Sequence, residues 1–391
     1  MEREALIYQD RRGTGCSKWD GQTPSFGEEG LDPFWVADMD FHAPQAVRKA
    51  LTHWAETAIF GYGGDKKAWM DSFLAWEETR HGLKAEADWL RYAPGIVTGI
   101  FWVISALTAP GDAVAVLKPV YYPFFHAVED TGRRLVYGTL RNDGGVYTVD
   151  FDALEQLFRE EKPKALLLSS PHNPVGRVFR REELERFCAL CETYGVLLLS
   201  DEIHQDLILP GHTQIPMLTL RQKNTVSFAA ASKTFNLAGL QNSFLLLPDP
   251  ALREKYDDFV RRVAHVSGGT EVGCIAAAAA FREGGPWLAS VLDQVEENYR
   301  AIRDILAGKA PRAVVSPLEG TYLMWVDLRP YVREQDAVHD LLQKTCRLAV
   351  DYGEWFGGDD YVGFIRLNLA TSRENCVRAA ERLGDALHAL R

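Results

Sequence analysis

The sequence predicts an α/β protein with a large domain, built on a mostly parallel central sheet, and a smaller α+β domain. Six short apolar segments recur through the chain, at residues 113–117, 134–140, 165–170, 196–200, 225–229 and 244–248. Most are apolar throughout rather than alternating, which is typical of parallel strands covered on both faces. Amphipathic helical patterns separate several of them and indicate βαβ units in an α/β/α sandwich.

The helical patterns also divide the chain. Residues 150–161 and 180–195 read as helices that lead into strands, and residues 270–285 read as a packed helix. From about Trp287 the pattern changes to a long helix, a short strand unit and a final helix. We therefore predict three parts: an N-terminal segment that joins the small domain (1–45), a large cofactor-binding domain (46–286) and a C-terminal small domain (287–391).

The composition excludes several classes of function. Of the 391 residues, 47% are apolar and 25% are charged, as in an ordinary globular protein. The net charge of −11 disfavours nucleic acid or an anionic membrane as the main partner. The chain shows neither an apolar signal core nor an apolar run of roughly 20 residues, so we expect a cytoplasmic protein without a membrane partner.

Two of the six cysteines, Cys188 and Cys191, form a C-x-x-C motif within a predicted amphipathic helix. A zinc site would need a second pair, and the other cysteines are scattered. We therefore expect free thiols on or near the buried face of this helix, and no metal site.

Chemically capable residues follow the predicted strands. Asn173 lies in the turn after one strand, Asp201 ends the next, and Lys233 follows a third. The strand at 113–117 leads into Pro119–Pro123, which contains two tyrosines, and a glycine-bearing turn at 94–99 opens a helical pattern. Ligands of open α/β sheets bind beyond the carboxyl ends of the strands, and a helix start offers N–H groups to an anion.

One cofactor, pyridoxal 5′-phosphate, needs all of these groups. It requires an amine for a Schiff base, a carboxylate beside its ring nitrogen, a donor to its phenolate oxygen, a stacking aromatic ring and a helix start for its phosphate. Each residue alone has an ordinary alternative: Asp201 could cap a helix, Asn173 could be a turn residue, and Lys233 could lie at the surface. Their placement at successive strand ends favours the cofactor site.

At this point the chain resembles the fold-type I pyridoxal-phosphate enzymes of the class I/II aminotransferase superfamily. Within them it is similar to the MalY/PatB branch of cystathionine β-lyases, or cysteine-S-conjugate β-lyases, over nearly its whole length. The resemblance rests on KWD (18–20), WVADMDF (35–41), FGY (60–62), SPHNPVGRVF (170–179), SDEIHQDL (200–207), SKTFNLAGLQNS (232–243) and FIRLNLATS (364–372).

The resemblance implies roles for the cofactor-binding residues. Lys233 would form the Schiff base and, once released, move the substrate α-proton. Asp201 would pair with the ring nitrogen, and Asn173 would donate to the phenolate oxygen. Tyr121, rather than its neighbour Tyr122, would stack on the ring.

Further residues would complete the site. Ser232 and the backbone around Ile96 and Val97 would hold the phosphate, and His204 would either line the pocket or be an ordinary histidine near the sheet edge. Three residues would contact the substrate: Arg366 as a bidentate clamp on the α-carboxylate, Ala37 at the pocket wall, and Tyr62, which would reach the active site of the other subunit of a homodimer. Arg366 could instead face solvent, and Tyr62 could be a packed aromatic residue.

The sequence departs from the aminotransferase pattern at two positions. Many aminotransferases carry an arginine on the phosphate eight residues after the lysine, where this chain has Gln241. Three residues before the lysine, where serine is frequent, the chain has Ala230. We therefore predict weaker retention of the cofactor than in a typical aminotransferase, or greater reliance on Tyr62 and backbone donors.

The resemblance favours α,β-elimination, in which L-cystathionine or another cysteine S-conjugate yields a thiol, pyruvate and ammonia. An aminotransferase is the alternative, because both reactions begin with the same proton abstraction. A regulatory protein that binds a transcription factor is a third reading, but the intact set of Lys233, Asp201, Asn173 and Arg366 argues against a purely non-catalytic protein. The expected substrate is a small amino acid in each enzymatic reading.

Overall fold

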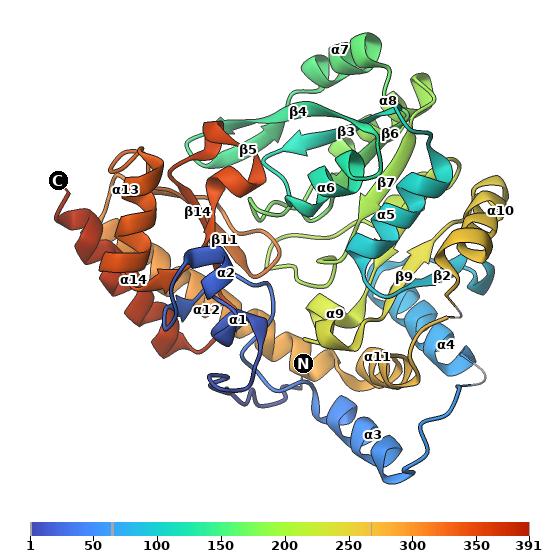
Figure 1. Cartoon of the computed structure of the whole chain (residues 1–391), viewed down its shortest axis with the longest axis horizontal. Helices are drawn as coiled ribbons and strands as arrows, with labels where there is room; N and C mark the ends of the chain where they lie inside the picture. Colours follow the sequence, from blue (N-terminus) through green and yellow to red (C-terminus); the bar gives the residue numbers. More distant parts are fainter. Residues whose placement is uncertain (1, 64–65, 267, 391) are drawn as a thin grey trace.

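The computed structural model describes residues 2–63, 66–266 and 268–390, and its largest element is an eight-stranded sheet (Figure 1). The strands are β2 (Leu90–Ala93), β3 (Ala113–Lys118), β4 (Arg134–Asp143), β5 (Val146–Val149), β6 (Ala165–Ser169), β7 (Leu197–Asp201), β8 (Thr225–Ala229) and β9 (Ser243–Leu246). Their order is β2-β9-β8-β7-β6-β3-β4-β5. The five strands from β8 to β4 run parallel, whereas β9 and β5 run antiparallel to their neighbours.

The six apolar segments of the sequence therefore form the centre of this sheet, as predicted. The two remaining strands, β2 and β5, were not expected. Both lie at the edges of the sheet, where one side lacks a neighbouring strand. Their short sequences, LRYA and VYTV, are partly exposed and carry little apolar signal.

Helices cover both faces of the sheet. On one face Phe158 of α7 (Phe151–Glu161) and Phe187 of α8 (Arg181–Thr193) join a buried cluster. On the other face Ile100 of α5 (Ile96–Leu107) and Phe124 of α6 (Pro123–Glu129) join a second cluster with α10 (Pro250–Phe259). The large part of the chain is thus the α/β/α sandwich that the sequence predicted.

A smaller antiparallel sheet lies in the C-terminal third, with the strand order β10-β11-β14-β13. Its strands are β10 (Val314–Val315), β11 (Leu323–Asp327), β13 (Asp351–Tyr352) and β14 (Phe364–Asn368), and the long helices beside it are α12 (Gly285–Lys309) and α14 (Arg373–His388). The N-terminal segment joins this part, because β1 (Asp32–Pro33) pairs with β12 (Leu348–Ala349). The predicted α+β region is therefore present, while the boundaries at residues 45 and 286 stay a prediction.

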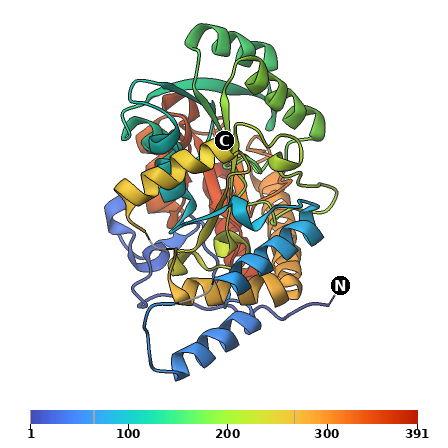
Figure 2. The same ribbon diagram turned by 90° about the vertical axis from the view of Figure 1, so that its right-hand side faces the viewer.

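The remaining α-helices are α1 (Ser17–Asp20), α2 (Thr23–Phe26), α3 (Gln45–Glu56), α4 (Lys67–Trp76), α9 (Ala231–Thr234), α11 (Glu271–Glu283) and α13 (Gln335–Asp340). In both views α3 and the loop after it project from the rest of the chain (Figures 1 and 2). Within the described parts of the chain, no helix combines the length and apolarity needed to cross a bilayer.

Candidate active site

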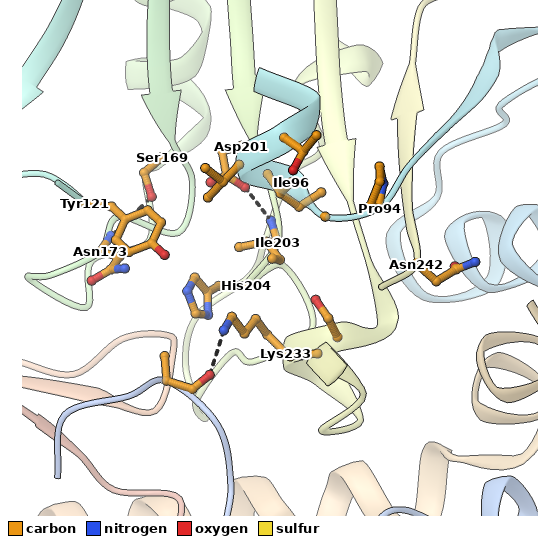
Figure 3. A pocket seen from close by; sticks show the side chains of 16 residues that line it. Pro94, Ile96, Tyr121, Ser169, Asn173, Asp201, Ile203, His204, Lys233 and Asn242 are labelled. Carbon is orange, nitrogen blue, oxygen red and sulfur yellow. Dashed lines mark hydrogen bonds between the residues drawn. The ribbon is translucent and has the colours of Figure 1, made fainter. Parts of the chain in front are cut away.

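A cavity opens at the carboxyl ends of β6, β7 and β8, as expected for a ligand site of an open α/β sheet (Figure 3). It encloses about 810 Å³ of empty space, including solvent at its mouth. Nine of the residues predicted from the sequence line it: Ala37, Ile96, Val97, Tyr121, Asn173, Asp201, His204, Ser232 and Lys233. The fold therefore brings together side chains that are up to 196 positions apart in the chain.

Lys233 extends from the short helix α9 into this cavity. Its Nζ atom donates a hydrogen bond of 2.6 Å to the carbonyl oxygen of Ala37 (Figure 3). Desolvation below the protein surface lowers the pKa of Lys233 to about 8, and the positive charge of Arg366 acts in the same direction. An amine with this pKa is neutral in a substantial fraction of molecules near neutral pH and can act as a base or a nucleophile.

Asp201 ends β7 on the side of the cavity opposite Lys233 (Figure 3). Its carboxylate accepts a hydrogen bond of 3.1 Å from the backbone N–H of Ile203. The side chain is buried, and desolvation raises the pKa of Asp201 to about 7. A cationic group in the cavity would stabilise this buried carboxylate in its charged form. Asp201 does not cap a helix, because the residues that follow it form turns.

Asn173 lines the cavity and is in direct contact with Arg366, which does not line it. Arg366 lies on β14 and is 2% exposed, so it does not face solvent. Its Nη1 atom donates a hydrogen bond of 2.8 Å to Oδ1 of Asn173. Because Oδ1 is held in this way, the Nδ2 group of Asn173 is the donor that remains for a ligand.

Tyr121, not Tyr122, lines the cavity. Tyr122 instead packs edge-on against Trp355 and Phe356. Desolvation raises the pKa of Tyr121 well above its ordinary value, so its ring is neutral. The placement favours Tyr121 as the stacking residue of the pair.

The first turn of α5 supplies an anion-binding corner of the cavity. Gly95 precedes the helix without a side-chain cap, and the first three helical residues, Ile96, Val97 and Thr98, line the cavity. Their N–H groups have no partner within the helix and carry the positive end of its dipole. Ser232 lines the same cavity. The hydroxyl of Thr98 was not predicted, although it follows Val97 directly in the same turn.

His204 lines the cavity and is 3% exposed. Its Nδ1 atom is buried without a hydrogen-bond partner. Desolvation and the nearby charge of Lys233 lower the pKa of His204 well below its ordinary value, so the imidazole is neutral. His204 therefore lines the pocket, and its role stays a prediction.

Besides Arg366, two residues named from the sequence lie outside the cavity. Tyr62 is fully exposed on the projecting loop after α3 and does not line the cavity of its own chain. Gln241 is also exposed, whereas its neighbour Asn242 lines the cavity and accepts a hydrogen bond from Trp69 Nε1 at 2.9 Å. The roles of Tyr62 and Gln241 stay predictions.

The segment 35–41, which we call the strap, passes beside the cavity and contributes Ala37 to its lining. Its central Ala37 carbonyl accepts hydrogen bonds from Lys233 Nζ and from the Tyr322 hydroxyl at 2.9 Å. Lys18, whose side chain is fully buried, forms an ion pair of 3.0 Å with Asp40 of the strap. Neither Tyr322 nor this ion pair was predicted. The strings KWD and WVADMDF contained a signal, since buried lysine and aspartate require partners.

Asp351 is a further residue that was not predicted from the sequence. It lies on β13 directly opposite Arg366 on β14 and forms an ion pair with it. Desolvation raises the pKa of Asp351 to about 6, although the adjacent arginine opposes that shift. Its sequence context, AVDYG, offers no pattern that distinguishes it from a surface aspartate.

The cavity fits pyridoxal phosphate on its own chemistry. Asp201 is a buried carboxylate that a protonated ring nitrogen would stabilise, and Lys233 is a desolvated amine that an aldehyde can capture. The uncapped start of α5 suits a phosphate. Among the residues that the structure describes, no cluster of three or more His, Cys, Asp or Glu is placed to hold a metal ion.

Comparisons with known proteins identify the family of the chain. The family model of aminotransferase class I and II matches residues 40–383. Cystathionine β-lyase PatB of Bacillus subtilis is 35% identical over 382 residues, which cover 97% of this chain and 98% of that protein. Protein MalY of Escherichia coli is 29% identical over 386 residues, which cover 98% of each chain.

A solved structure extends the likeness to three dimensions. The crystal structure of cystalysin from Treponema denticola, which contains a pyridoxal 5′-phosphate cofactor, superposes with a TM-score of 0.94 at 32% identity. The match covers 100% of both chains. The chain therefore belongs to the aminotransferase class I and II family of pyridoxal-phosphate enzymes, and within it to the MalY/PatB branch.

Proposed function

We propose that the chain is a pyridoxal-phosphate-dependent carbon–sulfur β-lyase. It would cleave L-cystathionine or another cysteine S-conjugate, with water, to a thiol, pyruvate and ammonia. A reaction on an amino acid is supported by one observation: the desolvated Lys233 amine lies opposite the buried Asp201 carboxylate in one cavity. The choice of elimination is supported by the similarity to a cystathionine β-lyase over 97% of the chain.

Five predicted residues would hold the cofactor. Lys233 would bind its aldehyde carbon covalently, Asp201 would face its ring nitrogen, and Asn173 Nδ2 would donate to its phenolate oxygen. Tyr121 would stack on the ring, and Ser232 with the N–H groups of the α5 start would bind the phosphate. When bound, pyridoxal phosphate draws electrons from the substrate α-carbon and so acidifies its proton.

Lys233 and Arg366 would act on the substrate itself. Arg366 would bind the α-carboxylate and orient the α-proton toward the amine of Lys233. Lys233, whose pKa of about 8 allows a neutral fraction near neutral pH, would accept that proton. The carbonyl of Ala37, 2.6 Å from Nζ, would keep the free amine beside the reacting carbon. Departure of the β-thiolate then completes the elimination.

The other subunit of a homodimer would supply Tyr62 to this cavity. Three apolar side chains of the loop after α3 are exposed with large fractions: Ile59, Phe60 and Tyr62. Such exposure of large apolar side chains is typical of a protein interface. Tyr62 would contact the partner's cofactor phosphate or substrate, and its loss would weaken the site in trans.

We also expect a cytoplasmic location. Each of the six cysteines is a free thiol, as is usual in a reducing compartment. Cys191 is buried on α8 and Cys188 is half-buried, and desolvation raises the pKa of both thiols, so they are unreactive.

The test is a paired assay of the purified enzyme with L-cystathionine. Equal release of pyruvate and thiol, without any added keto acid, is the expected result. Turnover that requires a keto-acid acceptor, with no pyruvate from L-cystathionine, would identify an aminotransferase and overturn the proposal. The visible absorbance of the bound cofactor shows in the same sample that the enzyme is loaded.

A further inference from the structure

The guanidinium that would bind substrate is already paired with a carboxylate of this chain. Asp351 and Arg366 face each other as direct partners across the antiparallel strands β13 and β14. Their side chains form an ion pair and are only 2% and 3% exposed, respectively. The pair is therefore shielded from the screening that weakens surface ion pairs.

The remaining contacts of Arg366 leave little capacity for a second carboxylate. Nη1 donates to Asn173, and Nη2 donates both to Asp351 and to the backbone oxygen of Trp35 at 3.2 Å. Nε is buried without a partner. A carboxylate binds a guanidinium bidentately either through Nη1 and Nη2 or through Nε and Nη2, so Nη2 takes part in both geometries.

A second negative charge would also meet Asp351 at close range. Two carboxylates on one buried guanidinium repel each other, and neither can be solvated by bulk water. Arg366 does not line the cavity in this structure, which is consistent with a guanidinium turned toward Asp351. The substrate must therefore displace or neutralise a partner that the protein itself provides.

We propose that Asp351 competes with the substrate α-carboxylate for Arg366 and thereby sets the affinity of the enzyme for amino acids. This inference rests on the proposed function, which assigns Arg366 to the substrate carboxylate. Asp351 is a positioning residue in this scheme, since it acts through Arg366 and not on the reacting atoms.

The competition makes amino-acid binding depend on pH. The titratable groups that face Asp351 are Arg366 on β14 and two tyrosines after β3, Tyr121 and Tyr122, whose pKa values are raised. Near neutral pH the tyrosines are neutral and Arg366 is charged, so Asp351 is the group that titrates. Its pKa is about 6, so protonation below that pH ends the competition and favours substrate binding.

The experiment is a binding titration of the cofactor-loaded enzyme with L-alanine, which has no β-leaving group. The dissociation constant is read from the change in cofactor absorbance, so no lyase turnover is required. We expect Asp351→Asn, which retains the shape and removes the charge, to lower the Kd for L-alanine about tenfold at roughly pH 7.5. The Kd for L-alaninamide, which lacks the carboxylate, should change little.

Two controls separate the possible failures. Asp327→Asn removes another carboxylate of the same small sheet, one that pairs with Arg329, and should leave both Kd values unchanged. Arg366→Ala should weaken L-alanine binding but spare L-alaninamide. If Arg366→Ala has no effect on L-alanine, the assignment of Arg366 fails and this inference fails with it.

An unchanged or higher Kd for L-alanine in Asp351→Asn, while Arg366→Ala still weakens binding, would overturn the competition and leave the proposed function intact. If the asparagine variant does not fold, the unmodified enzyme provides the test. Its Kd for L-alanine, relative to L-alaninamide, should fall as the pH is lowered through about 6. A ratio that is independent of pH there would also overturn the inference.

Discussion

The two walls of the cavity are built in different ways. On the sheet wall, Asn173, Asp201 and Lys233 follow three adjacent parallel strands, and strand pairing alone brings them together. On the opposite wall, the strap contributes Ala37, whose carbonyl accepts a hydrogen bond from Lys233, and Asp351 pairs with Arg366 outside the residues that line the cavity. The first wall is set by a regular pattern, whereas the second depends on individual buried contacts.

The strap is short, yet several side-chain hydrogen bonds hold its backbone. Asn368 donates from Nδ2 to the backbone oxygens of Val36 and Asp38, at 2.7 and 2.6 Å. Asn236 donates to the backbone oxygen of Met39 at 3.0 Å and accepts from its N–H at the same distance. Substitutions on the sheet wall should therefore remove groups that bind the cofactor or transfer protons. Substitutions that disrupt the strap should first lower the free energy of unfolding and displace the strap from the cavity.

The largest effect is expected for Lys233→Ala on the sheet wall. Loss of the amine removes both the covalent link to the cofactor and the base, so the rate of pyruvate release should fall by at least about 10³-fold. The visible absorbance of the covalently bound cofactor should disappear with it. Lys223→Ala, at an exposed lysine just before β8, is the matched control and should retain both signals. Normal absorbance in the Lys233 variant would contradict the assigned attachment site.

Asp201→Asn tests whether the sheet wall carries electrostatic function. The neutral amide cannot stabilise a protonated ring nitrogen, so we expect kcat to fall by about 10²-fold, measured as pyruvate release at saturating substrate. Asp304→Asn, at a largely exposed aspartate, should have no effect. Full activity of the Asp201 variant would show that the ring nitrogen needs no carboxylate.

The same variant makes a prediction for pH-dependent stability of the cofactor-free protein. The pKa of Asp201 is about 7 when folded, compared with about 4 in an unfolded chain. Between these values the folded state holds a proton that the unfolded state has lost, so raising the pH lowers the free energy of unfolding. Urea unfolding at several pH values should show that Asp201→Asn flattens this decline; an unchanged slope would contradict the raised pKa.

Lys18→Met tests the strap wall. The variant removes the nearer cation of the buried Asp40 carboxylate and leaves the Arg11 guanidinium at 3.9 Å, so the free energy of unfolding should fall by about 3 kcal/mol, measured by urea unfolding. Replacing both partners, as in Lys18→Met with Asp40→Leu, should recover part of that loss. The control is Lys84→Met, at an exposed pair with Glu78, which should change stability by less than about 1 kcal/mol. Equal losses of stability in Lys18→Met and Lys84→Met would contradict the proposed role of the buried pair in holding the strap.

Gln241→Arg should have the smallest effect. An arginine at this exposed position, one residue before Asn242 on the cavity wall, would add a charged partner for the phosphate. We expect the cofactor to dissociate about tenfold more slowly during dialysis against phosphate buffer. The original enzyme should lose its cofactor measurably under those conditions. Retention in the original enzyme through prolonged dialysis would contradict the predicted weakness of its phosphate site.

The residues of the sheet wall could be predicted from the amino-acid sequence. Apolar segments of strand length locate β3, β4, β6, β7, β8 and β9, and a parallel sheet places the residues after neighbouring strands at one edge. Asn173, Asp201, Lys233 and the start of α5 could therefore be assigned to one cofactor site from the sequence. The resemblance motifs then predicted Arg366 as the residue that binds the substrate α-carboxylate.

The contacts of the strap and of Asp351 could not be predicted from the sequence, because they depend on the packing of distant parts of the chain. The local pattern of AVDYG does not predict that Asp351 pairs with Arg366. A cross-strand partner depends on the register of the two strands, and these two residues are 15 positions apart in the sequence. Likewise, the contact between Ala37 and Lys233 spans 196 residues, and the strap that carries Ala37 is also paired with the buried Lys18 through Asp40. Periodicity reports which face of an element is buried, but the partner of a buried charge is set by how separate elements pack.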